Sequence, residues 1–178
     1  MVARYGGRGL RRWKHCHCRG TERQSDYGGG VSTSVALSAD GDTAIVGGPG
    51  DNRSSRSVPY GLGAAGAAWV FTRRGGVWRQ QGDKLVSNSG ARQGASVALS
   101  ADGNSALVGG LSDDGGLGAA SLFTRGGDQW MQSKKLVGTG AMTVSAVALS
   151  SDGSIAVIGA SNETGGVGAS WVFARTGQ

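Results

Sequence analysis

The chain has 178 residues, of which 35 are glycine and only 6% are aromatic, so few large side chains are present to fill a core. Its net charge of +6 is unevenly placed, because residues 1–30 hold seven Arg and Lys against two acidic residues, whereas residues 31–178 hold eleven against ten. A nucleic-acid-binding surface would belong to the folded part of the chain, which is nearly neutral. Composition therefore disfavours nucleic acid as a partner, and no apolar run predicts a membrane span or a signal peptide.

Residues 1–30 are predicted to be a basic leader that is either disordered or a degenerate half of a repeat unit. The second interpretation rests on residues 5–13, whose order of aromatic, Gly/Arg and Trp residues is similar to that of residues 71–78 and 123–130. The leader also holds His15-Cys16-His17-Cys18, a tract able to bind soft metals. Because the rest of the chain has no further His or Cys, we expect no metal site there.

One unit recurs three times after the leader. Residues 35–48 read VALSADGDTAIVGG, and the pattern returns at residues 97–110 and 147–160. Each copy has two short apolar runs around an Asp-Gly pair (at Asp40, Asp102 and Asp152), which predicts a tight two-residue β-hairpin turn with positive φ at both residues. The second run of each copy is continuously apolar, which predicts a strand buried on both faces.

Further strands are expected after each hairpin. A third strand is predicted at residues 66–73, 118–125 and 168–175, and a fourth at residues 77–86 and again up to Val137, whereas the third copy stops after its third strand. Successive copies start 62 and 50 residues apart, a period typical of propeller blades. The predicted fold is all-β, an incomplete β-propeller of four-stranded antiparallel blades, two complete and one partial, at residues 31–90, 91–140 and 141–178.

The repeated unit resembles the FG-GAP repeat. The resemblance rests on the strand start Gly94-Ala-Ser-Val-Ala98 and the strand end Val46-Gly-Gly-Pro49, and it covers about residues 30–178. The sequence departs from the family pattern by lacking its leading Phe and by holding the Pro in one copy only. The resemblance implies a propeller like that of the integrin α-chain head and of bacterial extracellular repeat proteins, an extracellular or cell-surface location, and a non-enzymatic interaction role.

Calcium is not expected to bind, although many FG-GAP repeats carry an Asp-x-Asp-x-Asp-Gly loop between their half-motifs. Here the Asp-Gly pairs are followed only by Asp42, Asn104 and Ser154. Calcium takes roughly six to eight oxygen ligands, more than a turn with one or two carboxylates supplies. We therefore predict that the chain holds no metal and no cofactor.

Catalysis is also disfavoured by the residues present. A serine nucleophile needs a base, and no His lies between residues 18 and 178. Residues 61–66 satisfy the dinucleotide pattern G-x-G-x-x-G, but the segment that follows them is strand-like rather than helical. The alternatives left open are a propeller-fold hydrolase or lyase, and nucleic-acid binding through the basic leader.

The candidate ligand-binding residues lie in the loops at one end of the predicted blades. In an up-and-down blade the turns alternate between the two ends of the sheet, so these loops share the end opposite the Asp-Gly turns. Polar residues on loops held by a rigid scaffold commonly carry recognition, and we expect a protein or glycan ligand. We also expect self-association through open blade edges. The candidate residues are Asp51, Asn52, Asp113, Asp114, Asn162 and Glu163.

Overall fold

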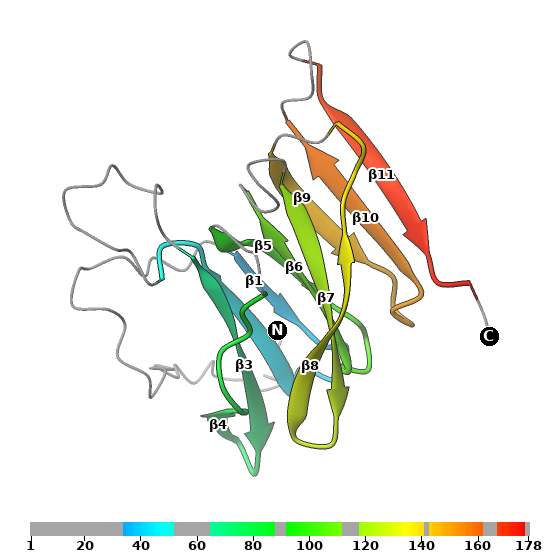
Figure 1. Ribbon diagram of the computed structural model, residues 1–178. Helices are drawn as coiled ribbons and strands as arrows, with labels where there is room; N and C mark the ends of the chain where they lie inside the picture. Colours follow the sequence, from blue (N-terminus) through cyan, green and yellow to red (C-terminus); the bar gives the residue numbers. More distant parts are fainter. Residues whose placement is uncertain are drawn as a thin grey trace, which may run out of the picture.

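The computed structural model describes residues 34–51, 65–87, 92–111, 118–140, 143–161 and 167–176. These residues form eleven strands in two four-stranded sheets and one three-stranded sheet, all antiparallel (Figure 1). We call the sheets blades 1, 2 and 3 in chain order. The described residues include no helix long and apolar enough to cross a membrane. The predicted fold class, all-β with two complete propeller-type blades and a partial third, is confirmed.

The strands of each blade follow one another in space as they do in the chain. Blade 1 comprises β1 (Ser34–Leu37), β2 (Thr43–Gly48), β3 (Ala67–Arg74) and β4 (Val77–Gln80); blade 2 comprises β5 (Gln93–Leu99), β6 (Ser105–Gly110), β7 (Ala119–Gly126) and β8 (Gln129–Leu136); blade 3 comprises β9 (Val144–Leu149), β10 (Ile155–Ala160) and β11 (Ala169–Ala174). Figure 1 shows β11, in red, at the free edge of blade 3. No described residue pairs with that edge.

The fourth strand of blade 1 is shorter than the predicted span of residues 77–86. Regular pairing with β3 ends at Gln80. The Gln81 N–H still donates to the Val70 oxygen at 2.8 Å, and the next backbone bonds to β3 are at Leu85, whose N–H and C=O both bond Ala68. The corresponding strand of blade 2 continues to Leu136 through one irregularity beside Phe123. One residue more lies between Gln80 and Leu85 than between Gln132 and Leu136, which accounts for the interrupted ladder.

The blades pack through apolar faces that alternate along each strand. Ile45 and Val70 of blade 1 belong to one core cluster with Val97, Val108 and Phe123 of blade 2. The opposite face of blade 2 forms the second cluster with blade 3; its residues are Leu107, Ala120, Leu122, Leu136, Val144, Ala156 and Ile158. Because successive side chains of a strand point to opposite faces, blade 2 is covered on both sides.

Burial on both faces, predicted for the middle strand of every copy, holds for β6 alone. All six residues of β6 are buried. In β2 the outward-facing Ala44 and Val46 are half-buried, and in β10 Ile155 is exposed. The sequence pattern is the same in all three strands, but only blade 2 lies between two others.

Glycine permits the close approach of blades 1 and 2. Gly94, with φ of 83°, lies so near blade 1 that a Cβ built on it would be 2.3 Å from the carbonyl oxygen of Ala67 and 2.7 Å from the amide nitrogen of Gly48. Both contacts are to backbone, which has little freedom to move aside. The glycine-rich composition thus lets backbones of neighbouring blades pack in place of large side chains.

We predict that Gly94→Ala lowers the free energy of unfolding by about 2 to 4 kcal/mol, because alanine meets both a left-handed backbone and a backbone clash. Gly126→Ala is the matched control, since a Cβ there has no atom within 4 Å and the change should stay within about 0.5 kcal/mol. Urea unfolding followed by circular dichroism measures both. Equal stability of the two variants would contradict the close approach.

Candidate functional site

Asp51 is the one predicted ligand-binding residue within the described part of the chain. Its side chain is only 2% exposed, and its Oδ2 accepts a hydrogen bond from Nζ of Lys84 at 2.9 Å. Its backbone oxygen also accepts a bond from the Gly66 N–H at 3.0 Å. Asp51 therefore links the segment after β2 to the segment after β4. Its carboxylate, which the sequence predicts to face a ligand, is instead buried in an ion pair with Lys84.

The other predicted site residues, Asn52, Asp113, Asp114, Asn162 and Glu163, lie outside the described residues, as does the His15 to Cys18 tract. The glycine pattern of residues 61–66 is followed directly by strand β3. The segment after the pattern is therefore a strand, as the sequence predicts. Within the ranges that the structure describes, no three His, Cys, Asp or Glu side chains gather closely enough to hold a metal ion.

The Asp-Gly turns differ from the predicted two-residue type. Between β1 and β2 the loop spans residues 38–42, and of these only Gly41 has positive φ, at 69°. Asp40 closes the loop with its side chain, because its Oδ1 accepts bonds from the Ser38 hydroxyl at 2.5 Å and from the Asp42 N–H at 2.9 Å. The prediction of positive φ at both residues is wrong, since this acceptor role leaves the Asp backbone in an ordinary conformation.

The same loop chemistry recurs in blades 2 and 3. Asp102 Oδ1 accepts from the Ser100 hydroxyl and the Asn104 N–H, and Asp152 Oδ1 accepts from the Ser150 hydroxyl and the Ser154 N–H; these hydrogen bonds span 2.5 to 3.0 Å. The serine hydroxyl, and then the backbone N–H, lower the pKa of Asp40, of Asp102 and of Asp152, the last to about 2.

Backbone hydrogen bonds link these loops in a row from blade to blade. The Ala39 N–H donates to the Ala101 oxygen at 2.9 Å, and the Ala101 N–H donates to the Ser151 oxygen at 2.8 Å. The glycine of each following loop packs on the preceding loop: a Cβ on Gly103 would lie 2.8 Å from Oγ1 of Thr43. The loops therefore act as structural contacts between blades.

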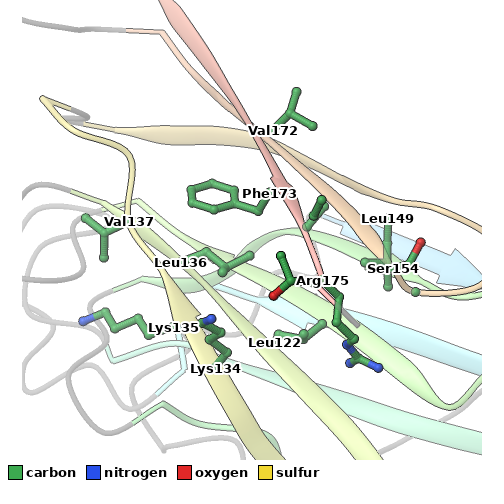
Figure 2. A pocket seen from close by; sticks show the side chains of 14 residues that line it. Leu122, Lys134, Lys135, Leu136, Val137, Leu149, Ser154, Val172, Phe173 and Arg175 are labelled. Atoms are coloured by element: carbon green, nitrogen blue, oxygen red, sulfur yellow. The ribbon is translucent and has the colours of Figure 1, made fainter. Parts of the chain in front are cut away.

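A groove of about 690 Å³ opens between blades 2 and 3 (Figure 2). Its apolar wall includes Leu122, Leu136 and Phe173, and three cationic side chains, Lys134, Lys135 and Arg175, also line it. Figure 2 shows the Phe173 ring above Leu136, with Lys134 and Arg175 in the lower half of the view. The groove thus combines an apolar wall with positive charge beside the free edge of β11.

The corresponding place between blades 1 and 2 is partly filled by the fourth strand of blade 2. The cavity there is about 410 Å³ and is lined in part by Trp130 of β8, whose ring packs against the core between these blades. The Trp130 indole N–H donates to Gln81 Oε1 at 3.2 Å. Blade 3 has no described strand at this position, so the larger groove occupies the place where a fourth strand would lie.

The arginine near the end of the third strand also has different surroundings in blade 3 than in blades 1 and 2. Arg73 and Arg125 each lie with the guanidinium carbon 5.9 Å from the ring centre of a fourth-strand tryptophan, Trp78 and Trp130 respectively, within range of a cation–π attraction. Arg175 is their equivalent in blade 3. No described residue pairs with its guanidinium, which lines the groove instead.

These features define the described part of the chain as an array of β-propeller-type blades, the last of which has three described strands. No family model matches the sequence, and no curated protein matches it. Two solved structures are similar: hydrazine synthase of Kuenenia stuttgartiensis (18% identity, TM-score 0.45) and TolB of Acinetobacter baumannii (13% identity, TM-score 0.48). The alignments cover 83% and 81% of this chain but 33% and 30% of those proteins, so the chain spans about a third of their length.

The loop carboxylates predict a loss of stability in acid. Because the folded pKa values lie below the usual 3.8, to about 2 at Asp152, the ionised loops stabilise the fold above about pH 4, and this contribution is lost as pH falls towards about 2. We expect Asp→Asn at Asp40, Asp102 and Asp152 together to flatten the fall in melting temperature over this window. Thermal unfolding at a series of pH values measures it, and an unchanged slope would refute the role of these carboxylates.

Proposed function

We propose that the chain is a non-enzymatic interaction module that binds an extended segment of a partner protein along β11, over the groove between blades 2 and 3. The observation that supports this most directly is the outer edge of β11, with which no described strand pairs. Open strand edges offer backbone N–H and C=O groups to an added strand. The pairing of β7 with β8 in blade 2 is the model for that addition.

The side chains around the groove define the chemistry of the segment. In blades 1 and 2 the fourth strand presents a tryptophan to the arginine of the third strand, so an aromatic residue facing Arg175 would repeat this contact in blade 3. The ring of this aromatic residue would also pack against the apolar wall of the groove, which includes Leu136 and Phe173. Lys134 and Arg175 favour acidic residues beside the aromatic one.

Residues 5–13 of the chain itself end in Trp13 and have an order of residues similar to the fourth-strand hairpins. They belong, however, to a leader with seven basic and two acidic residues, and this charge opposes binding beside Lys134 and Arg175. An acidic segment of another protein is therefore the favoured occupant.

The resemblance to FG-GAP propellers supports three further parts of the proposal: an extracellular or cell-surface location, a binding rather than enzymatic role, and recognition through loops. The motif at residues 46–49 and 94–98 carries that resemblance. Binding of a protein or glycan at the loop end, through Asn52, Asp113, Asp114, Asn162 and Glu163, stays a prediction.

The chain supplies a probe for the groove, because the peptide of residues 127–137 contains its own β8. We expect a fluorescent form of this peptide with both lysines replaced by glutamate to bind the full chain, measured by anisotropy. Arg175→Glu in the protein should weaken binding by more than about tenfold, since it removes the cation–π contact and reverses the charge.

Two controls separate groove binding from other causes. Arg74→Glu changes an exposed arginine outside the groove and should leave the affinity unchanged, and a peptide with Ser at the Trp130 position should bind more weakly. Equal binding of both peptides, or no effect of Arg175→Glu, would refute the proposal. If only a protein lacking residues 1–30 bound the peptide, the occupant would be the leader and not a partner.

A further inference from the structure

We propose that copies of this 178-residue chain associate head to tail, with the outer face of blade 3 in one copy packed on the outer face of blade 1 in the next. The contact would repeat the interface that joins blade 1 to blade 2 and blade 2 to blade 3. It uses sheet faces, whereas the proposed peptide site uses the β11 edge and the groove. Val172 also lines that groove, but Val35 and Leu37 do not, so either proposal can fail alone. It also differs from the edge association predicted from the sequence.

The outer face of blade 1 is one half of this interface without its partner. Val35 and Leu37 of β1 are 72% and 61% exposed. The residue equivalent to Val35 in blade 2 is Val97, which is 8% exposed because it packs on blade 1. Burying two large apolar side chains stabilises an interface, and no charged residue interrupts β1 (Ser34–Leu37).

The outer face of blade 3 is the other half. Val172 of β11 is 69% exposed, whereas its equivalents Val70 in blade 1 and Leu122 in blade 2 are 0% and 9% exposed. Val70 packs into the core with blade 2, and Leu122 packs into the core with blade 3. Val172 thus has the position of a core residue without the next blade to cover it.

The two exposed faces are unlike and complementary, because each internal interface joins one face of each kind. The face of Val70 and Leu122 always meets the face of Val97 and its blade 3 equivalent, Val147. A contact between Val172 of one copy and Val35 of another would join the same two kinds of face. Continuity with the internal interfaces therefore favours a second copy of this chain over an unrelated partner.

The row of loop hydrogen bonds supports the same direction of assembly. Ala39 donates to Ala101, and Ala101 donates to Ser151. Within the described residues, the Ser151 N–H and the Ala39 oxygen have no such partner and stand at opposite ends of this row. In the proposed contact the Ser151 N–H of one copy donates to the Ala39 oxygen of the next.

The contact joins different surfaces of the two copies, so it generates either a closed ring or an open filament. Propellers close with roughly four to eight blades, and two copies together contain six described blades. The expected assembly is a closed dimer of twice 17.9 kDa.

Sedimentation velocity of the full chain across the micromolar range tests the proposal. We expect dimers for the wild type and monomers for each of two variants, Val35→Glu/Leu37→Glu and Val172→Glu, because a charge on either face is costly to bury. Met131→Glu is the control, since Met131 is 66% exposed on β8 and lies on neither face, and it should dimerise like the wild type.

Mixing the two face variants separates a loss of the interface from a loss of folding. One variant keeps the blade 3 face and the other keeps the blade 1 face, so mixed dimers joined by these two intact faces should form. Circular dichroism should show the wild-type strand signal for each variant alone. A wild-type monomer at every concentration, a mixture that stays monomeric, or dimers that survive both variants would each overturn the proposal. The last result would place the contact at the β11 edge.

Discussion

The structure depends on the packing of one blade face against the next. Only a small share of the residues is aromatic, so no single sheet carries enough large side chains to form a core of its own. The core instead consists of two apolar layers, one on each side of blade 2. Glycines such as Gly94 let the backbones approach closely. Backbone hydrogen bonds between the Asp-Gly turns also join neighbouring blades at one end.

Both proposals follow from where this packing stops. Blade 3 has a third strand but no described fourth, which leaves the β11 edge unpaired and Arg175 without the tryptophan that Arg73 and Arg125 contact. Within the described residues, no further blade covers the outer faces of blades 1 and 3, and Val35 and Val172 are exposed there. In a repeat array each unit packs only on its neighbours, so both proposed contacts lie where the described blades end.

The sequence predicts the strands, their order and the blade architecture, because alternation and a repeated pattern are local signals. It does not predict the burial of Asp51, since its partner Lys84 is 33 residues away in the chain. It also misses the turn type, which depends on the Ser38 side chain. It does not predict the groove either, because the residues that line it come from strands of two different blades.

Hydrogen exchange of backbone amides, measured strand by strand on dilute protein, tests most directly whether the fold is built around blade 2. We expect the slowest exchange in β6 (Ser105–Gly110), which is paired on both sides and buried at every residue. We expect the fastest exchange among the strands at β11, where every second amide faces the edge with which no described strand pairs. Equal protection of β6 and β11 would contradict this central role of blade 2.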